Sequence, residues 1–199
     1  MMRRVLRGAG LIALVGATAS CGNVARQGRS PVYLVIDAFN VANGGTSTPT
    51  FVGAPLLSDV LTKGSVFNDL GQVTLHISLK DIGNGSTALL PSTNNEVTID
   101  RYHVDYIRAD GHNTPGVDVP YGFDGTITGT VPTNATMIIG FEIVRHDAKL
   151  EAPLQQLVSN LAVINTIANV TFYGHDQVGN VVSVTGSVSV EFANFADPS

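Results

Sequence analysis

The chain has 199 residues, a length that fits one domain or one domain with a long insertion. It carries 16 Asp and Glu against 11 Lys and Arg, for a formal net charge of −5. Nucleic acid is excluded as a partner, because phosphate binding needs clustered positive charge and the basic residues beyond the N-terminus are scattered. The acidic balance also argues against flat electrostatic docking on anionic lipid.

The first 21 residues have the layout of a secretory signal. Arg3, Arg4 and Arg7 precede an apolar run at 8–19, and small residues follow it. A basic start, a short apolar run and a small residue before the cut are the three parts of such a signal. The run is too short to cross a bilayer, which needs roughly 20 apolar residues. Cleavage would remove three arginines and leave eight basic residues against sixteen acidic ones, a net charge of −8.

Cys21, the only cysteine, follows this run at the end of the sequence Thr18-Ala19-Ser20-Cys21. One cysteine cannot form an internal disulfide, so a thiol in an exported protein needs another explanation. The four residues resemble the lipobox of bacterial lipoproteins, with Thr18 where that family usually has Leu or another large aliphatic residue. The resemblance implies a cleaved signal peptide at 1–20 and a lipidated Cys21 as the new N-terminus. Gly22, in place of the Asp that retains enteric relatives, implies export to the outer membrane.

Residues 21–31 are predicted to hold the lipidated cysteine and a polar tether, and 32–199 the folded domain. At most about 3.4 Å per residue, the stretch from 22 to 30 reaches on the order of 30 Å. The domain is therefore expected close to its membrane. The alternative is an ordinary secreted protein cut nearby, in which Cys21 is a bystander.

From residue 32 onward the chain is rich in Val, Ile, Thr and Gly, which indicates strands separated by turns. Apolar and polar residues alternate in most of these segments, so each strand has one buried and one wet face. Two such sheets must pack their apolar faces together. Seven strands are predicted, at 32–42, 72–82, 96–108, 123–131, 135–146, 167–176 and 181–192.

Seven strands are the number in an immunoglobulin-like sandwich. The chain has no Trp and no cysteine pair, so the resemblance concerns architecture alone. The predicted fold is all-β, an immunoglobulin-like antiparallel β-sandwich with one possible short helix, and a small closed barrel is the alternative. The last two strands are expected to form a hairpin through the turn at 175–180.

In the predicted strand at 96–108, the apolar residues switch from odd to even positions. Val97 and Ile99 lie on odd positions, whereas Tyr102, Val104 and Tyr106 lie on even ones. One extra residue at Asp100 or Arg101 would return all of them to a common side, which is the effect of a β-bulge.

In two regions, apolar and polar residues do not alternate as they do in a strand. A segment at 43–49 is rich in Gly, Ser and Thr, and 51–70 continues without alternation, so this part of the chain is predicted to carry a contact surface. A local mini-core formed by its leucines is the alternative. In the second region, leucines at helical spacing after Pro153 predict a short helix at 153–161, with an extended loop as the alternative.

No catalytic motif is present, and no catalytic residue or cofactor is expected. His103 and Asp105 share a strand face and are weak candidates for two metal ligands, although any wet strand face can carry this spacing. Asp110, Asp118 and Asp124 lie in and beside an acidic, glycine-bearing loop, which makes them weak candidates for calcium. The same residue types are common in turns.

The whole chain resembles bacterial lipoproteins that carry one β-sandwich domain, on the signal, the lipobox and the strand pattern. This resemblance brings no active-site residues with it. The expected function is a non-enzymatic, lipid-anchored envelope module that binds or scaffolds another envelope protein. The alternative is a lipid-anchored enzyme, or a binder of calcium or a small ligand, that acts at the irregular loops.

Overall fold

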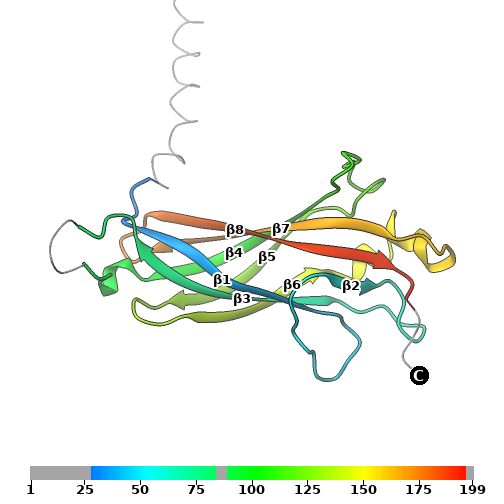
Figure 1. Ribbon diagram of the computed structural model, residues 1–199, viewed down its shortest axis with the longest axis horizontal. Coiled ribbons are helices and arrows are strands. Elements are labelled where there is room, and N and C mark those ends of the chain that lie inside the picture. The colour runs from blue at the N-terminus through cyan, green and yellow to red at the C-terminus, as the bar shows by residue number, and fades with distance from the viewer. Residues whose placement is uncertain (1–27, 84–88, 196–199) are drawn as a thin grey trace, which may run out of the picture.

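The computed structural model describes residues 28–83 and 89–195, and these form an elongated, two-layered β-sandwich (Figure 1). Cys21 and the predicted signal peptide lie outside the described residues. The three-stranded sheet has the order β1-β3-β6, with bounds Val32–Ala42, Asp69–Leu79 and Met137–Val144. The five-stranded sheet has the order β2-β8-β7-β4-β5, with bounds Leu56–Asp59, Val181–Ala193, Ile164–Asp176, Val97–Ile107 and Phe123–Val131.

This architecture confirms the predicted all-β sandwich. All seven predicted strands form, and β7 and β8 pair as the closing hairpin. The described residues contain an eighth strand, β2, which the sequence did not predict. It has four residues and pairs in parallel with the end of β8. Because the partner strand, β8, lies far along the chain, no local sequence pattern predicts β2.

The alternation along each strand places its apolar residues between the two sheets. In β3, Val73, Leu75 and Ile77 are buried, while the residues between them are half-buried. In β5 the buried positions are Phe123, Ile127 and Val131. Burying apolar side chains of this size stabilises a fold by about 1.5–3 kcal/mol each, so these inner faces supply the main stabilising term.

The predicted bulge in β4 is confirmed. The register shifts between Ile99 and Arg101 against both neighbours, β5 and β7, which makes Asp100 the extra residue. Residues on both sides of the shift therefore point into the core, with Ile99 and Val104 fully buried.

The described residues contain little helix. The predicted helix at 153–161 is a 3-10 helix, η2 (Leu154–Ser159), that begins after Pro153 and buries Leu154 and Leu157. Two further short helices, η1 (Thr93–Asn95) and α3 (His146–Lys149), were not predicted. In the part of the chain that the structure describes, no helix is long and apolar enough to cross a membrane.

Candidate functional site

The outer strands of the two sheets leave a cavity between them. β5 pairs only with β4, and β6 pairs only with β3, so each strand has one edge without a strand partner among the described residues. Between these edges lies an open cavity of about 510 Å³, which we call the edge cavity. Its lining residues are Phe51, Leu70, Gly71, Tyr102, Gly125, Thr126, Gly140, Phe141 and Glu142.

Two aromatic rings lie over glycines in the edge cavity. A Cβ on Gly125 would collide with the ring of Tyr102, and a Cβ on Gly71 would collide with the ring of Phe141. The two ring centroids are 5.2 Å apart, which is the spacing of a favourable aromatic pair. The glycines therefore let the rings tilt across the sheet edge and form an apolar floor.

Side chains close the gap between β5 and β6 on either side of the edge cavity. Near the hairpin turn, Gly129 of β5 lies against the side chains of Met137 and Ile139 of β6. At the other end, the Arg145 guanidinium lies 4.4 Å from the centroid of the Phe123 ring. The Nε atom of Arg145 is buried and has no hydrogen-bond partner among the described residues.

The edge cavity has polar as well as apolar lining, and Glu142 contributes a charged group to it. The carboxylate of Glu142 accepts a hydrogen bond from the Asn68 side-chain amide, with Nδ2 and Oε1 2.6 Å apart. Burial raises the pKa of Tyr102 above its usual value. The edge cavity therefore combines an apolar floor with polar groups that could orient a bound segment.

The structure brings together three of the weak metal candidates on the wet face of β4 and β5. His103 Nε2 lies 3.0 Å from Asp105 Oδ2, and His103 Nδ1 lies 3.1 Å from Asp124 Oδ1. Asp124 also pairs with Arg101, whose guanidinium stacks 3.7 Å from the centroid of the Tyr173 ring. Across residues 28–83 and 89–195, no three His, Cys, Asp or Glu residues are grouped as metal ligands would be. These residues form a row of exposed ion pairs.

In the loop predicted to bind calcium, the carboxylates of Asp110 and Asp118 accept hydrogen bonds from neighbouring residues of the same loop. Arg108 donates hydrogen bonds to Asp110 and lowers the pKa of that carboxyl to about 2. Asp118 accepts a hydrogen bond from the Thr114 backbone N–H at 3.0 Å. The loop therefore has the ordinary hydrogen bonds of a turn.

The predicted contact region at 51–70 divides into two parts. Leu56 and Val60 are 2% and 0% exposed and belong to the main core, so they offer no contact surface. Phe51 and Leu70, at its two ends, line the edge cavity. Two backbone hydrogen bonds between Val41 and Val52 hold Phe51 in place.

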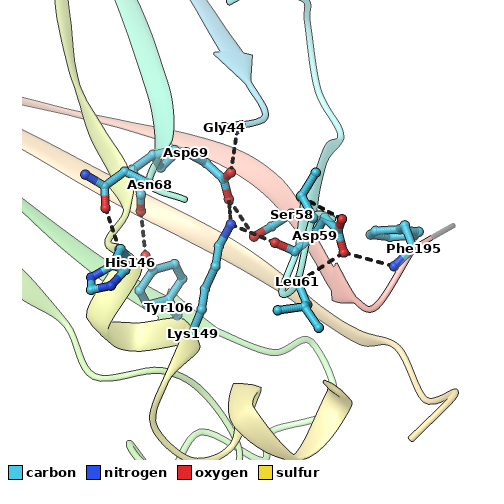
Figure 2. Close-up of polar contacts among 12 residues, drawn as sticks. Gly44, Ser58, Asp59, Leu61, Asn68, Asp69, Tyr106, His146, Lys149 and Phe195 are labelled. Carbon is cyan, nitrogen blue, oxygen red and sulfur yellow. Dashed lines mark hydrogen bonds and ion pairs between the residues drawn. The ribbon is translucent and has the colours of Figure 1, made fainter. Parts of the chain in front are cut away.

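A buried cluster of charges lies where β3, β2 and α3 meet (Figure 2). Asp69 Oδ2 lies 2.9 Å from Lys149 Nζ and accepts a hydrogen bond from the Ser58 hydroxyl at 2.6 Å. The other carboxylate oxygen accepts the Gly44 N–H, and Lys149 Nζ also donates to the Asp59 carbonyl. Burial raises the pKa of Asp69, against the lowering effect of Lys149 and these hydrogen bonds.

This buried cluster was not predicted from the sequence. Ser58, Asp69 and Lys149 are each at most 1% exposed, so a substrate could not reach them. A lysine next to a charged stretch looks like a surface residue, and its partner lies 80 positions earlier. The cluster joins three separate segments and has a structural role.

No protein-family model matches this chain, and no curated protein has a significantly similar sequence.

Proposed function

We propose that the chain is a non-enzymatic, lipid-anchored module of the bacterial cell envelope that binds an extended segment of another envelope protein. The edge cavity carries the binding part of this proposal. Unpaired strand edges offer N–H and C=O groups to an added strand, and a pocket beside such an edge accepts one of its side chains. The edges of β5 and β6 flank an apolar floor of this kind. The anchoring part rests on Cys21 and the residues before it.

A bulky side chain in the lining of the edge cavity should prevent the partner protein from binding. A Cβ on Gly140 would meet nothing closer than the Gly71 carbonyl at 3.9 Å, so Gly140→Phe can be accommodated in the open space. After crosslinking of native envelopes and affinity purification, the wild-type protein is expected to bring down a partner that Gly140→Phe loses. Gly53→Phe is the matched control, because a Cβ there meets nothing within 4 Å and Gly53 lies outside the cavity.

The two variants must first show the same thermal unfolding as the wild-type protein. An unchanged partner after Gly140→Phe would remove the edge cavity as the binding site. Hydrolysis of a panel substrate by the wild-type protein would contradict the non-enzymatic part of the proposal.

Cys21→Ala should release the protein from the membrane or leave its precursor uncleaved. The lipid is attached through the thiol, and alanine offers no sulfur for that bond. Growing cells with a clickable palmitate should label the wild-type protein and leave Cys21→Ala unlabelled. A wild-type protein without label would contradict lipid anchoring.

A further inference from the structure

Strand β6 forms one outer edge of the three-stranded sheet, and its sequence leaves that edge unprotected. Within residues 28–83 and 89–195 it pairs with β3 alone, and 137–141 contain no charge and no proline. The register against β3 is continuous over these residues, so no bulge interrupts them. Charges, prolines and bulges are the features that keep an edge strand from pairing with another chain.

The opposite edge of the same sheet has such protection. In β1 the register shifts between Ile36 and Ala38, which makes the charged Asp37 a bulged residue. Its carboxylate lies 2.8 Å from Nδ1 of His76 on β3. Of the two outer strands of this sheet, β6 is therefore the one open to an added strand.

The backbone of β6 shows which residues face the free edge. The Glu142 N–H donates a hydrogen bond to the hydroxyl of Tyr102 on the other sheet, so it points away from β3. In an antiparallel ladder, successive residues direct their N–H and C=O groups to alternate sides. Gly140 and Ile138, two and four positions before Glu142, therefore also direct theirs to the free edge.

Gly140 is a glycine that the packing of the domain does not require. A Cβ on Gly71 or Gly125 would collide with an aromatic ring, whereas a Cβ on Gly140 would meet nothing closer than a carbonyl at 3.9 Å. Gly140 is also exposed. A glycine inside a regular strand often marks a place where another backbone approaches closely.

Glu142 gives this edge a negative charge. Its side chain is half-buried in the lining of the edge cavity. None of the ion pairs that Lys or Arg forms in the described part of the chain involves Glu142. Arg145, three positions later, stacks on the Phe123 ring. A basic side chain from a partner would complement the carboxylate.

We propose that the partner segment pairs with β6 as a fourth strand of its sheet and carries a lysine or arginine that meets Glu142. The inference rests on the proposed binding at the edge cavity. The N–H and C=O groups of Ile138 and Gly140 hold the backbone of the segment. Because the Tyr102 hydroxyl already holds the Glu142 N–H, the ladder ends there. A second copy of β6 would not supply the charge, since 135–143 contain no Lys or Arg.

Substitutions at Gly140 test whether the backbone of β6 binds the segment. Gly140→Pro removes the N–H that faces the free edge, and proline is tolerated at such positions of edge strands. Gly140→Ala keeps that N–H and is the matched control. Glu142→Gln removes the charge and keeps an oxygen for the Asn68 amide. The probe is a phage-displayed library of random decapeptides, selected on the purified full-length protein.

The selected peptides should alternate apolar and polar residues and contain Lys or Arg. Fluorescence anisotropy should show affinity about tenfold weaker for Gly140→Pro and for Glu142→Gln, and within about threefold of wild type for Gly140→Ala. Amide hydrogen exchange of the wild-type protein decides the matter if proline lowers its stability. The N–H groups of Ile138 and Gly140 should exchange quickly in the free protein and slowly with a selected peptide, and unchanged exchange would contradict the pairing.

The outcomes separate this inference from the proposed function. Peptides that Gly140→Phe excludes and Gly140→Pro binds normally would contradict strand addition and leave the edge cavity as the binding site. Peptides that Glu142→Gln binds equally well would contradict the basic partner. A wild-type dimer that Gly140→Pro dissociates would mean that a second copy occupies the edge, which also contradicts it. A library without any peptide sensitive to Gly140→Phe would contradict both proposals.

Discussion

Lys149→Met should destabilise the protein by about 3–5 kcal/mol, because it leaves the carboxylate of Asp69 buried without its cation. Methionine has a length similar to that of lysine but carries no charge, so the loss comes mainly from the removed ion pair and hydrogen bond. The measurement is the free energy of unfolding from urea titrations at neutral pH. Lys80→Met is the matched control. Lys80 is exposed, and its contact with the Tyr33 ring should contribute about 1 kcal/mol or less.

The double variant Lys149→Met with Asp69→Leu should recover much of this loss, since it buries two apolar groups in place of one unpaired charge. The single variant should also lose stability as pH rises. Without Lys149 the pKa of Asp69 rises further above its usual value, so folding favours the protonated carboxyl. That stability is present below pH about 3.9 and disappears as pH climbs through the folded pKa. A flat pH profile together with a small loss would mean that water reaches the cluster.

Phe172→Ala should cost about 3–5 kcal/mol, the range for removing a large ring from a rigid core. Phe172 is fully buried in β7, and its ring centroid lies 5.1 Å from Phe141 and 6.3 Å from Tyr102. These three rings join the two sheets beneath the edge cavity. The same urea titrations measure the change.

Thr171→Ala, one position earlier on the wet face, is the control for this prediction. It removes one hydrogen bond to the Thr185 hydroxyl, worth about 1 kcal/mol. Similar losses at residues 171 and 172 would contradict the assignment of inner and outer faces along β7.

Most of the sandwich follows from local patterns in the sequence. The alternation in β3 assigns its inner face, because successive side chains of a strand point to opposite faces. The change of phase in β4 places the bulge at Asp100 or Arg101, and the register of the structure makes it Asp100. The short strand β2 has no such signal. It forms because the edge of β8 is available for pairing. Pairing with a strand so far along the chain produces no recognisable pattern in a segment of four residues.

The candidate site could be predicted only in part. The irregular segment at 51–70 was predicted to carry a contact surface, and Phe51 and Leu70 at its two ends line the edge cavity. Nothing local in the sequence separates these residues from Leu56, which is buried. The edge cavity depends on Gly71, Gly125 and Gly140, which belong to three strands of two sheets. Their meeting is a property of topology, so the sequence pattern along any one strand could not reveal it.

The pairing of β2 with β8 also sets an order of events during folding. β2 stays unpaired until the last strand arrives, and the Asp59 carboxylate then accepts the N–H of Phe195, 136 positions away along the chain. Contacts between such distant residues form slowly, because a long loop must close first. A chain emerging from the ribosome N-terminus first would therefore leave the five-stranded sheet incomplete until β8 (Val181–Ala193) had been made.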